Sequence, residues 1–327
     1  MIKPFLKWPG GKSRVMPELL KSLPVGDCLF EPFVGGASVF LATDYRRYVL
    51  ADINPDLINL YRCVLHSSDL VTGLAEQLFN NCNDKESYYK IREDFNKPFF
   101  ASKAVRYGRD IRLIFRAVQF FYLTRHCYNG VVRYNPSGGF NVPYGKYERV
   151  YFPANEIRLF SEKAKDTKTL FLCASFQRSL QVITGNNVVV YCDPPYLPAS
   201  KSACFTQYHA EPFTADHHRQ LVNGLIDANR QHGAKVVISN SDTAETREIY
   251  KPFRLHKISV QRSVSSNGDR PKASEVIGVL PVCPGCGRYG GGCPDCGAVM
   301  GDATYAEVFS SVTNKPVWCG LDPAGGF

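Results

Sequence analysis

The sequence predicts an α/β protein built on an open, mostly parallel β-sheet, and three observations lead to this expectation. Short apolar runs alternate with helical patterns in the first sixty residues and again after residue 148. The run Val188 to Cys192 is rich in β-branched residues, as expected of a strand buried on both faces. A hydrophobic fraction of 44% in 327 residues can bury such a core. The length allows one large domain with an insertion or appendage, or two modest domains.

The tetrapeptide Asp193-Pro194-Pro195-Tyr196 directly follows that strand. Open α/β sheets bind their ligands at the carboxyl ends of their strands. The Asp193 carboxylate and the Pro194 carbonyl, held rigid by two prolines, can both accept hydrogen bonds from one exocyclic amine, and Tyr196 offers a flat face to a base. The same residues also fit a strand that simply leaves the sheet through a proline-rich turn.

The first dense motif is Phe5-Leu6-Lys7-Trp8-Pro9-Gly10-Gly11-Lys12-Ser13. Its glycines let the backbone approach an anionic or zwitterionic ligand, and Lys12 can meet a carboxylate there. The glycine spacing before the lysine is too short for a P-loop, which argues against a nucleoside triphosphate. A short helix is expected from Met16 to Leu23.

A strand at Cys28 to Glu31 runs into Pro32-Phe33-Val34-Gly35-Gly36-Ala37. A strand that breaks on glycines and opens a helix is typical of the first βα turn of a nucleotide-binding sheet, and places Phe33 and Gly35 beside the ligand. The pattern is not G-x-G-x-x-G, so NAD is disfavoured. Glycines here also fit an ordinary turn.

The next strand, Tyr48 to Ala51, ends in Asp52. An acidic residue at the end of the second strand can accept hydrogen bonds from ribose hydroxyls, which makes Asp52 a candidate cofactor ligand. Asp52 and Asn54 can also cap a helix that starts near Pro55, and the two roles are compatible.

Between residues 61 and 147 the alternation of strand and helix stops. Residues 69–80 and 110–125 carry apolar side chains at helical spacing, which predicts the core of a small helical subdomain. The arginines of the second segment fit either a solvated face or a phosphate-facing one; they are Arg106, Arg109, Arg112, Arg116 and Arg125.

Residues 128–147, called the ribbon below, interleave aromatic, amide, arginine and glycine residues, with a hairpin turn expected at Gly138-Gly139. Such a segment can enter a DNA major groove, where Arg reads guanine and Val or Pro contacts a thymine methyl. Tyr or Asn can fill the space left by an extruded base. Taken alone, the ribbon is also compatible with a plain loop.

The second half of the chain completes the predicted sheet. A strand is expected at residues 170–176, with Ser175 and Phe176 flanking the adenine of a cofactor. A helix over residues 216–232, capped by Thr214 and closed by Gly233, precedes a strand at residues 235–240. Two further short strands surround residues 262–272, whose composition suits a phosphate-contacting turn or a flexible loop.

From residue 282 onward two Cys-Pro-x-Cys-Gly units appear. Four thiolates on two tight turns predict a closed, structural Zn²⁺ site, although the units are closer together than in most zinc ribbons. Unliganded cysteines or a redox pair are the alternatives. The expected ligands are Cys283, Cys286, Cys293 and Cys296.

The overall charge and the start of the chain bear on partner and compartment. A formal charge of +9 favours a polyanionic partner, although a merely basic enzyme fits as well. The first residues lack the apolar core of a signal peptide, and no apolar stretch could span a bilayer. We therefore expect a cytoplasmic protein without membrane partners, whose 12 cysteines do not form a disulfide framework.

Four motifs occur in a specific order: the first motif, then Glu31-Pro32-Phe33-Val34-Gly35-Gly36, then Asp52-Ile53-Asn54-Pro55-Asp56, then the tetrapeptide. In this order they closely resemble the Dam-type, or D12 class, DNA adenine-N6 methyltransferases over residues 1–280. The resemblance implies a Rossmann-like sheet that binds S-adenosyl-L-methionine, and methylation of adenine in duplex GATC by base flipping and direct transfer. It also implies a bacterial or phage-encoded enzyme, for which we expect a monomer. Gly36-Ala37 stands where other members often have Ala-Gly.

The resemblance assigns roles residue by residue. It implies a catalytic domain at residues 1–60 and 148–281, a target-recognition insertion at 61–147, and leaves 282–327 as a zinc-binding tail outside the family pattern. The expected catalytic residues are Asp193, Pro194 and Tyr196; the cofactor ligands are Trp8, Lys12, Phe33, Gly35, Asp52, Ser175, Phe176 and Asp193; the DNA contacts are Lys7, Tyr128, Asn129, Val131, Arg133, Pro143, Tyr147, Asn267 and Arg270.

Two other functions are compatible with parts of this pattern. A related tetrapeptide serves methyltransferases of RNA or of protein glutamine, which have no reason to carry the ribbon. A non-catalytic DNA-binding protein could keep the sheet and use its tail for contact, but the intact cofactor motifs argue against it.

Overall fold

The computed structural model describes residues 2–12, 14–97, 110–185, 187–197, 213–261 and 272–281. Its centre is a seven-stranded sheet with strand order β3-β2-β1-β4-β5-β7-β6. Strands β1 to β5 run parallel to one another, and β7 pairs antiparallel with both β5 and β6. The predicted α/β fold is therefore confirmed. The strands are β1 Cys28–Glu31, β2 Arg47–Asp52, β3 Leu170–Cys173, β4 Val188–Cys192, β5 Lys235–Ser241, β6 Arg254–Gln261 and β7 Lys272–Val279.

The strand order reverses between β1 and β4, which pair with each other. Such a switch point opens a crevice at the carboxyl ends of the two strands, and ligands of open α/β sheets bind there. The glycine turn follows β1 and the tetrapeptide follows β4, so the topology brings both motifs to this crevice.

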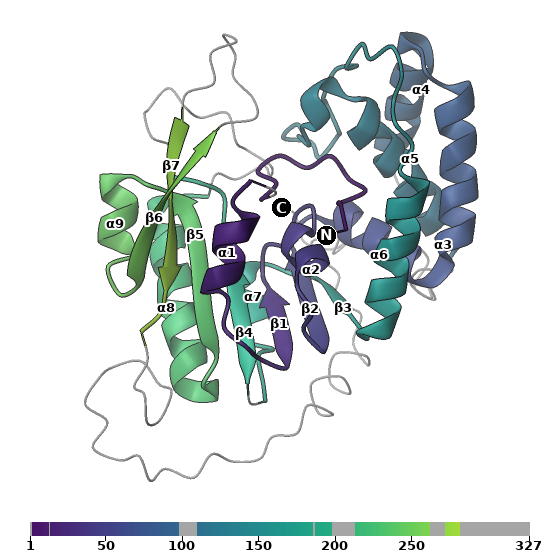
Figure 1. Ribbon diagram of the computed structural model, residues 1–327. Coiled ribbons are helices and arrows are strands. Elements are labelled where there is room, and N and C mark those ends of the chain that lie inside the picture. The colour runs from purple at the N-terminus through teal and green to yellow at the C-terminus, as the bar shows by residue number, and fades with distance from the viewer. Residues whose placement is uncertain are drawn as a thin grey trace, which may run out of the picture.

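Helices cover both faces of the sheet and extend well beyond one of its edges (Figure 1). Helices α3 to α6 form a group beside the β3 edge, whereas α1 lies in front of the sheet and α8 behind it. The helices are α1 Met16–Ser22, α2 Ser38–Ala42, α3 Pro55–Asn81, α4 Lys85–Asn96, α5 Ile111–His126, the 3₁₀ turn η1 Tyr128–Gly130, α6 Ala154–Asp166, α7 Phe176–Leu180, α8 Ala215–His232 and α9 Ala244–Ile249.

Alternate residues of the parallel strands point into two separate hydrophobic clusters. In β1, Leu29 packs with helices α3 to α6 on one face, whereas Phe30 packs with α8 and α9 on the other. In β2, Leu50 and Val49 divide in the same way. The sheet is thus buried on both faces, which is why its strands lack the polar alternation of a half-exposed sheet.

The sequence signals at the ends of α8 are confirmed. Thr214 and His217 form a reciprocal capping box at its start, and Gly233 ends it with a left-handed φ of 66°. The expected positions also agree with the structure for strands β1 to β5 and for helices α1, α5 and α8, each of which begins or ends within two residues of its predicted bound.

Some expected elements differ. Strand β3 ends at Cys173, three residues early, because Ser175 accepts a hydrogen bond from the Arg178 N–H and caps the short helix α7. The helix expected at 69–80 is the second half of α3, which is kinked at Ser67 (φ −143°). Helices α4, α6 and α9 were not predicted, although Asp84 and Thr243 cap the first and last of them.

The helices of the expected insertion share one continuous core with a face of the sheet. Phe79 of α3 and Phe121 of α5 belong to the same cluster as Leu50 and Phe171 of the sheet. The domain boundaries at residues 60, 147 and 281 stay predictions. Among the described helices, none combines the length and apolar character that crossing a membrane requires.

Candidate active site

Side chains of β5 and α8 hold the tetrapeptide and Leu197, the residue that follows it. The Leu197 N–H donates to Asn240 Oδ1 (3.2 Å), and Ser241 Oγ donates to the Leu197 carbonyl (3.0 Å). His218 Nε2 donates to the Pro195 carbonyl (3.1 Å) while Nδ1 lies 2.8 Å from the Tyr250 hydroxyl. Burial lowers the pKa of His218 to about 4, so this histidine is neutral and holds the Pro195 carbonyl in place by a hydrogen bond.

Asp193 and Tyr196 lie in a cluster with Lys12 and Glu275. Lys12 Nζ lies 2.9 Å from Asp193 Oδ1 and 3.7 Å from Glu275 Oε2, and also contacts the Tyr196 hydroxyl. The Tyr196 hydroxyl donates to Glu275 Oε2 (2.8 Å). Lys12 was expected to meet a ligand carboxylate, but in the structure two protein carboxylates hold its ammonium.

A second hydrogen-bond chain reaches Asp193 from the neighbouring strand. Ser239 Oγ of β5 donates to Asp193 Oδ1 (3.0 Å) and lies 2.9 Å from the Tyr191 hydroxyl. Burial raises the pKa of Asp193, as does the Glu275 charge, and the Lys12 ammonium and the Ser239 hydroxyl oppose that rise. Lys12 and Ser239 thus both stabilise the ionised carboxylate, which is the form that accepts a hydrogen bond from an amine.

Glu31, the last residue of β1, lies at the floor of this crevice. Burial and, to a smaller extent, the nearby Asp193 carboxylate raise its pKa to about 8, against the opposing effect of a backbone hydrogen bond from Phe40. Its Oε1 has no hydrogen-bond partner among the described residues. A carboxyl in this setting holds its proton at neutral pH.

The expected cofactor residues of β1 and β2 are brought together around the glycine turn. The Gly35 N–H donates to Asp52 Oδ2 (3.1 Å), and the Asn54 N–H donates to Oδ1 (3.0 Å). Trp8 packs on the turn so closely that a Cβ at Gly35 would lie 3.0 Å from its Nε1. Burial raises the pKa of Asp52 to about 6, although the residue remains partly accessible. Asn54, rather than Asp52, caps α3.

Aromatic side chains form the neighbouring wall. Phe33 stacks on Phe176 with ring centroids 5.8 Å apart, and Phe213 packs edge-on against both. Ser175 precedes Phe176 at the start of α7. Apolar faces and a carboxylate thus share one edge of the sheet, at the carboxyl ends of β1 to β3.

Ala37 adopts a left-handed conformation with φ 58°. This conformation costs an L-residue about 1–2 kcal/mol, whereas glycine adopts it freely. Ala37 therefore places a side chain at a left-handed position that glycine would occupy without this cost.

The first motif and the ribbon meet at Lys7. Its ammonium lies 4.2 Å from the centre of the Tyr147 ring, and Gly130 packs directly on its side chain. Burial, followed by the charge of Arg125, lowers the pKa of Lys7. Tyr128, 57% exposed, and Asn129, in a left-handed conformation, stand beside this pair at the start of the ribbon.

The rest of the ribbon forms an irregular hairpin. Gly138 takes a left-handed φ of 79° in the turn, and Tyr134 bridges Phe140, so the expected turn is confirmed. Arg133 is exposed, and its Nε donates to Asn141 Oδ1 (2.8 Å). Two further expected DNA contacts differ in accessibility: Pro143 is exposed, whereas Val131 packs partly against the core.

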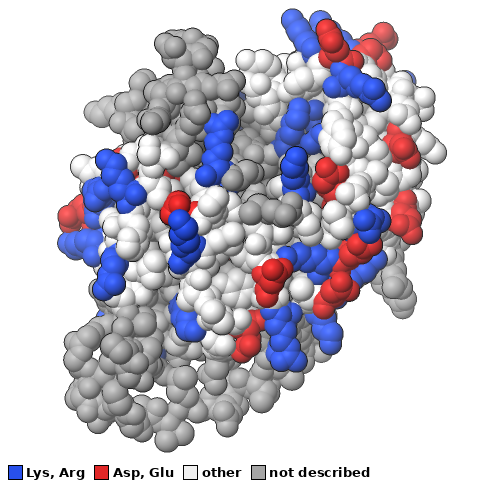
Figure 2. All heavy atoms as spheres, in the orientation of Figure 1, with Lys and Arg blue, Asp and Glu red and all other residues white. Residues whose placement is uncertain are grey.

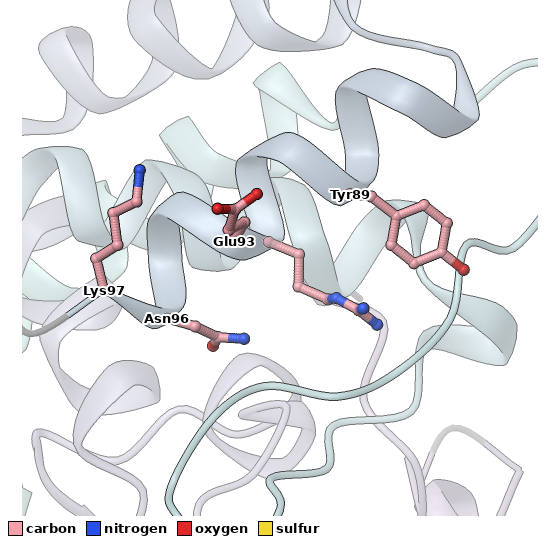
Figure 3. Close-up of a pocket in the computed structure, with 5 residues that line it drawn as sticks. Tyr89, Glu93, Asn96 and Lys97 are labelled. Atoms are coloured by element: carbon pink, nitrogen blue, oxygen red, sulfur yellow. The ribbon is translucent and has the colours of Figure 1, made fainter.

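Helix α4 supports the ribbon from behind. Asn96 bonds both the Phe140 carbonyl (3.0 Å) and the Phe140 N–H (2.8 Å), and Arg92 donates to the Val142 carbonyl (3.1 Å). A hollow of about 570 Å³ lies along this side of α4 (Figure 3). It is lined by side chains of α4 and by Lys97, which follows the helix, and it is separate from the tetrapeptide, so it is not the active site.

The arginines of α5 are mainly structural. Arg116 pairs with the buried Asp56 (2.6 Å), and Arg125 donates to the Tyr151 carbonyl (2.6 Å). Arg112 pairs with Asp110 at the start of the helix. Arg106 and Arg109 lie outside the described residues.

Several other expected site residues also lie outside the described ranges. They are the DNA contacts Asn267 and Arg270 and the zinc ligands Cys283, Cys286, Cys293 and Cys296. Within the described ranges, no group of three or more His, Cys, Asp or Glu side chains could hold a metal ion. The zinc site stays a prediction.

Sequence reasoning did not single out Glu31, Ser239, Glu275 or His218 as site residues. Glu31 carried a signal, because a carboxylate inside an apolar strand is costly unless the site uses it or protonates it. Glu275 lies 82 residues after Asp193 and carried no local signal. Its position depends on the pairing of β7 with β5, where Glu275 opposes Ser241.

The sheet order, the glycine turn after β1 and the braced tetrapeptide after β4 define a methyltransferase-like α/β protein. The sequence model of the D12 class N6 adenine-specific DNA methyltransferases matches residues 8–264. The chain belongs to this family.

Similar proteins agree with the assignment. The DNA adenine methylase of Escherichia coli K12 is 44% identical over 283 residues, covering 84% of this chain and 93% of that protein. The Retron Ec67 DNA adenine methylase of Escherichia coli is 42% identical over 275 residues, with 84% and 90% coverage. A crystal structure of SMU.1697c from Streptococcus mutans with SAH covers 86% of this chain and 100% of that chain at 9% identity, but its TM-score of 0.32 is too low to support an argument.

Proposed function

We propose that this DNA adenine methyltransferase methylates the N6 amine of adenine in double-stranded GATC, with S-adenosyl-L-methionine as donor and with the target base flipped out of the helix. The observation that carries the proposal is the braced Asp193-Pro194-Pro195-Tyr196 at the switch point, beside the glycine turn. Membership of a DNA methyltransferase family leaves the RNA, protein-glutamine and non-catalytic alternatives without support.

The residues after β1, β2 and β3 fit the methyl donor. The partly accessible Asp52 carboxylate can accept hydrogen bonds from ribose hydroxyls, and the Phe33 and Phe176 rings offer apolar faces to an adenine. Gly35 and Trp8 border the same space. Bound there, S-adenosyl-L-methionine supplies an electrophilic methyl group on a sulfonium sulfur.

The tetrapeptide orients the acceptor. The Asp193 carboxylate and the Pro194 carbonyl accept the two amine hydrogens, which directs the nitrogen lone pair away from the base plane, and Tyr196 stacks on the flipped adenine. After methylation the nitrogen carries one extra proton, which the Asp193 carboxylate can accept. The gain comes from orientation and electrostatics, and no cysteine acts as a nucleophile.

Recognition is assigned to the ribbon and to Lys7. Lys7, Tyr147 and the exposed Tyr128 lie together at one end of the ribbon, and the Arg133 guanidinium is exposed further along. Figure 2 shows Lys and Arg side chains near the middle of this face, between the sheet and the helices beside it. This arrangement suits a phosphate backbone that passes over the crevice.

The test is methyl incorporation from labelled S-adenosyl-L-methionine into two duplexes that differ only in GATC versus GTTC. Incorporation confined to the GATC duplex supports the reaction and the target. Equal incorporation would refute the recognition assignment, and none in either would refute the proposed function. Asp193→Ala serves as the control and should abolish transfer while DNA and donor still bind.

We further propose that residues 282–327 bind one Zn²⁺ through the four cysteines of the two Cys-Pro-x-Cys-Gly units. Elemental analysis of the purified protein should give about one zinc per chain. Replacing Cys283 and Cys286 by Ser should remove the metal, and zinc retained in that variant would contradict the assignment.

A further inference from the structure

A hollow of about 720 Å³, called the β6 groove below, lies between α1 and the last two strands of the sheet. Helix α1 packs against β7 in front of the sheet (Figure 1), and β6 lies beyond β7 as the last strand in the sheet order. None of the described residues that line the groove belongs to the tetrapeptide, the glycine turn or the ribbon. The methyl-transfer site therefore leaves this groove without a function.

The floor of the β6 groove is apolar. Ile277 and Val279 of β7 and Ile258 of β6 lie on one face of the sheet, because alternate residues of a strand share a face and Ile258 pairs with Glu275 of β7. Ile277 is buried, whereas Ile258 and Val279 are only half-buried. Helix α1 thus leaves part of an apolar sheet face uncovered.

The rim of the groove is basic. Arg254 and Lys257 line it from β6, and Lys21 lines it from α1. Glu18, the one acidic side chain among the described residues that line the groove, pairs with Lys21 (2.8 Å). Lys257 lies 3.7 Å from Asp242, outside the groove, but Arg254 makes neither an ion pair nor a side-chain hydrogen bond with a described residue. An apolar floor with a basic rim fits an acidic segment that also carries apolar side chains.

The chain itself supplies such a segment next to the groove. Pro281, the last residue that the structure describes, lines the groove, so the tail starts there. Residues 289–314 of the tail include Asp295, Asp302 and Glu307 but no Lys, Arg or His. Their larger apolar residues are Val299, Met300, Tyr305, Val308, Phe309 and Val312. The eight residues that lead from Pro281 to this segment span up to about 28 Å, which is ample for a return to the groove.

We propose that residues 289–314 dock in the β6 groove, with their carboxylates on the basic rim and their apolar side chains over the half-buried floor. Tethering beside the groove gives the segment an effective concentration on the order of millimolar, so modest contacts suffice. The docked segment covers the apolar face that α1 leaves open and gives Arg254 a counterion. The proposal depends neither on methyl transfer nor on zinc.

The test is cleavage of the full-length protein by chymotrypsin after Tyr305 and Phe309 at low salt, followed by mass spectrometry. A docked segment is cut only when it leaves the groove, so the rate follows the population of the undocked form. Arg254→Glu places a carboxylate on the rim and should accelerate cleavage roughly three- to tenfold, the effect of losing one or two surface ion pairs. The matched control is Arg219→Glu, which reverses an exposed arginine on α8 and should be cleaved at the wild-type rate.

Two further measurements test the electrostatic contact directly. Replacing Asp302 and Glu307 by Arg in the Arg254→Glu protein should restore slow cleavage, because opposite charges then face each other again. Raising the salt concentration about tenfold should accelerate cleavage of the wild type, since exposed ion pairs are screened. A synthetic peptide of residues 289–314 corrects for the effect of salt on the protease. The salt measurement needs no substitution, so it decides the question even if Arg254→Glu does not fold.

Equal cleavage rates for the wild type and a folded Arg254→Glu variant would overturn the proposal. Loss of affinity for duplex DNA in that variant, with unchanged tail cleavage, would also overturn it and assign the groove to DNA phosphates. A wild-type dimer that Arg254→Glu converts to a monomer, measured by light scattering, would overturn it in favour of a second copy of the chain. Absence of methyl transfer would refute the proposed function but would not alter any of these outcomes.

Discussion

At the scale of single residues, Glu31 links the active site to the stability of the fold. Its pKa is about 8 in the folded protein, mainly because of burial, against 4.5 for an ordinary glutamate. Between these values the folded state holds a proton that the unfolded state has lost. The free energy of unfolding therefore falls as pH rises from 4.5 to 8, and the contribution is fully present only below 4.5.

Glu31→Gln replaces the protonated carboxyl with a neutral amide of similar shape. Relative to the wild type, the variant should gain stability as pH rises, by a few kcal/mol in order of magnitude between pH 5 and pH 8.5. Urea denaturation of both proteins at the two pH values measures this difference. Glu18→Gln, which alters an exposed carboxylate, should show no such gain. A difference that is constant with pH would contradict a protonated Glu31.

Arg133 tests base recognition at the same scale. Its side chain is exposed, with Nε bound to the Asn141 side chain (2.8 Å) and one terminal nitrogen bound to the Asn141 carbonyl (3.5 Å). Arg133→Ala should cost about 1–3 kcal/mol of discrimination at one base pair. Methylation rates on duplexes substituted at each position of the site measure this effect. The control is Arg149→Ala, which removes an exposed arginine after the ribbon. Equal losses of rate on all duplexes in both variants would show that Arg133 does not read a base.

Residues that follow the parallel strands could be placed from the sequence, and those that depend on the antiparallel pairing of β7 could not. Gly35 and Asp52 meet as expected because β1 and β2 pair in parallel, which brings the ends of the two strands together. Glu275 meets Asp193 only because β7 runs antiparallel beside β5, and no pattern within β7 indicates that register. Lys12 was placed in the right crevice, but its carboxylate partners come from two distant strands.

At the scale of elements, Asp56 connects the end of β2 to α5 and to the ribbon. It lies in the first turn of α3, just after β2, and is 4% exposed. Its oxygens accept Arg116 of α5 (2.6 and 3.2 Å) and the Tyr134 hydroxyl of the ribbon (2.8 Å). One carboxylate thus fixes the position of two helices and a hairpin.

Asp56→Asn should lower the free energy of unfolding by roughly 2–3 kcal/mol, because it leaves the Arg116 charge without its counterion. The cost is below that of a fully buried pair, since the Arg116 side chain is 23% exposed. Chemical denaturation measures the loss. The control is Asp216→Asn, whose pair with Arg219 on α8 is largely exposed and should matter little. Equal effects of the two substitutions would show that Asp56 does not join these elements.

Element prediction succeeded where local signals agreed and failed where they were short. The cap residues of α8 and the β-branched run of β4 sufficed to place both. At Ser175 and Phe176 an apolar run continued past the true end of β3, so the capping serine was included in the strand. Short apolar runs fit a strand and a buried helical turn equally well, and the tertiary contacts decide between them.

At the scale of the whole molecule, charge is divided unequally between the catalytic part and the tail. Residues 282–327 contain two basic and four acidic residues, so residues 1–281 alone carry a formal charge of +11 against +9 for the whole chain. The family match ends at residue 264, and the last described strand, β7, ends at Val279. The family match and the described sheet thus both end before residue 282.

A chain that ends after Pro281 should therefore fold and methylate DNA at a rate similar to that of the full-length protein. Its affinity for DNA at low salt should be equal or higher, because removing the acidic excess leaves a more positive molecule. Thermal unfolding, single-turnover methylation and the salt dependence of DNA binding measure the three quantities, with a full-length variant of all four tail cysteines to Ser as the matched control. Loss of methylation in the truncated chain, with retention in the cysteine variant, would show that the tail contributes to catalysis by a route other than zinc binding. Loss of methylation in both proteins would show that the zinc site is required for catalysis.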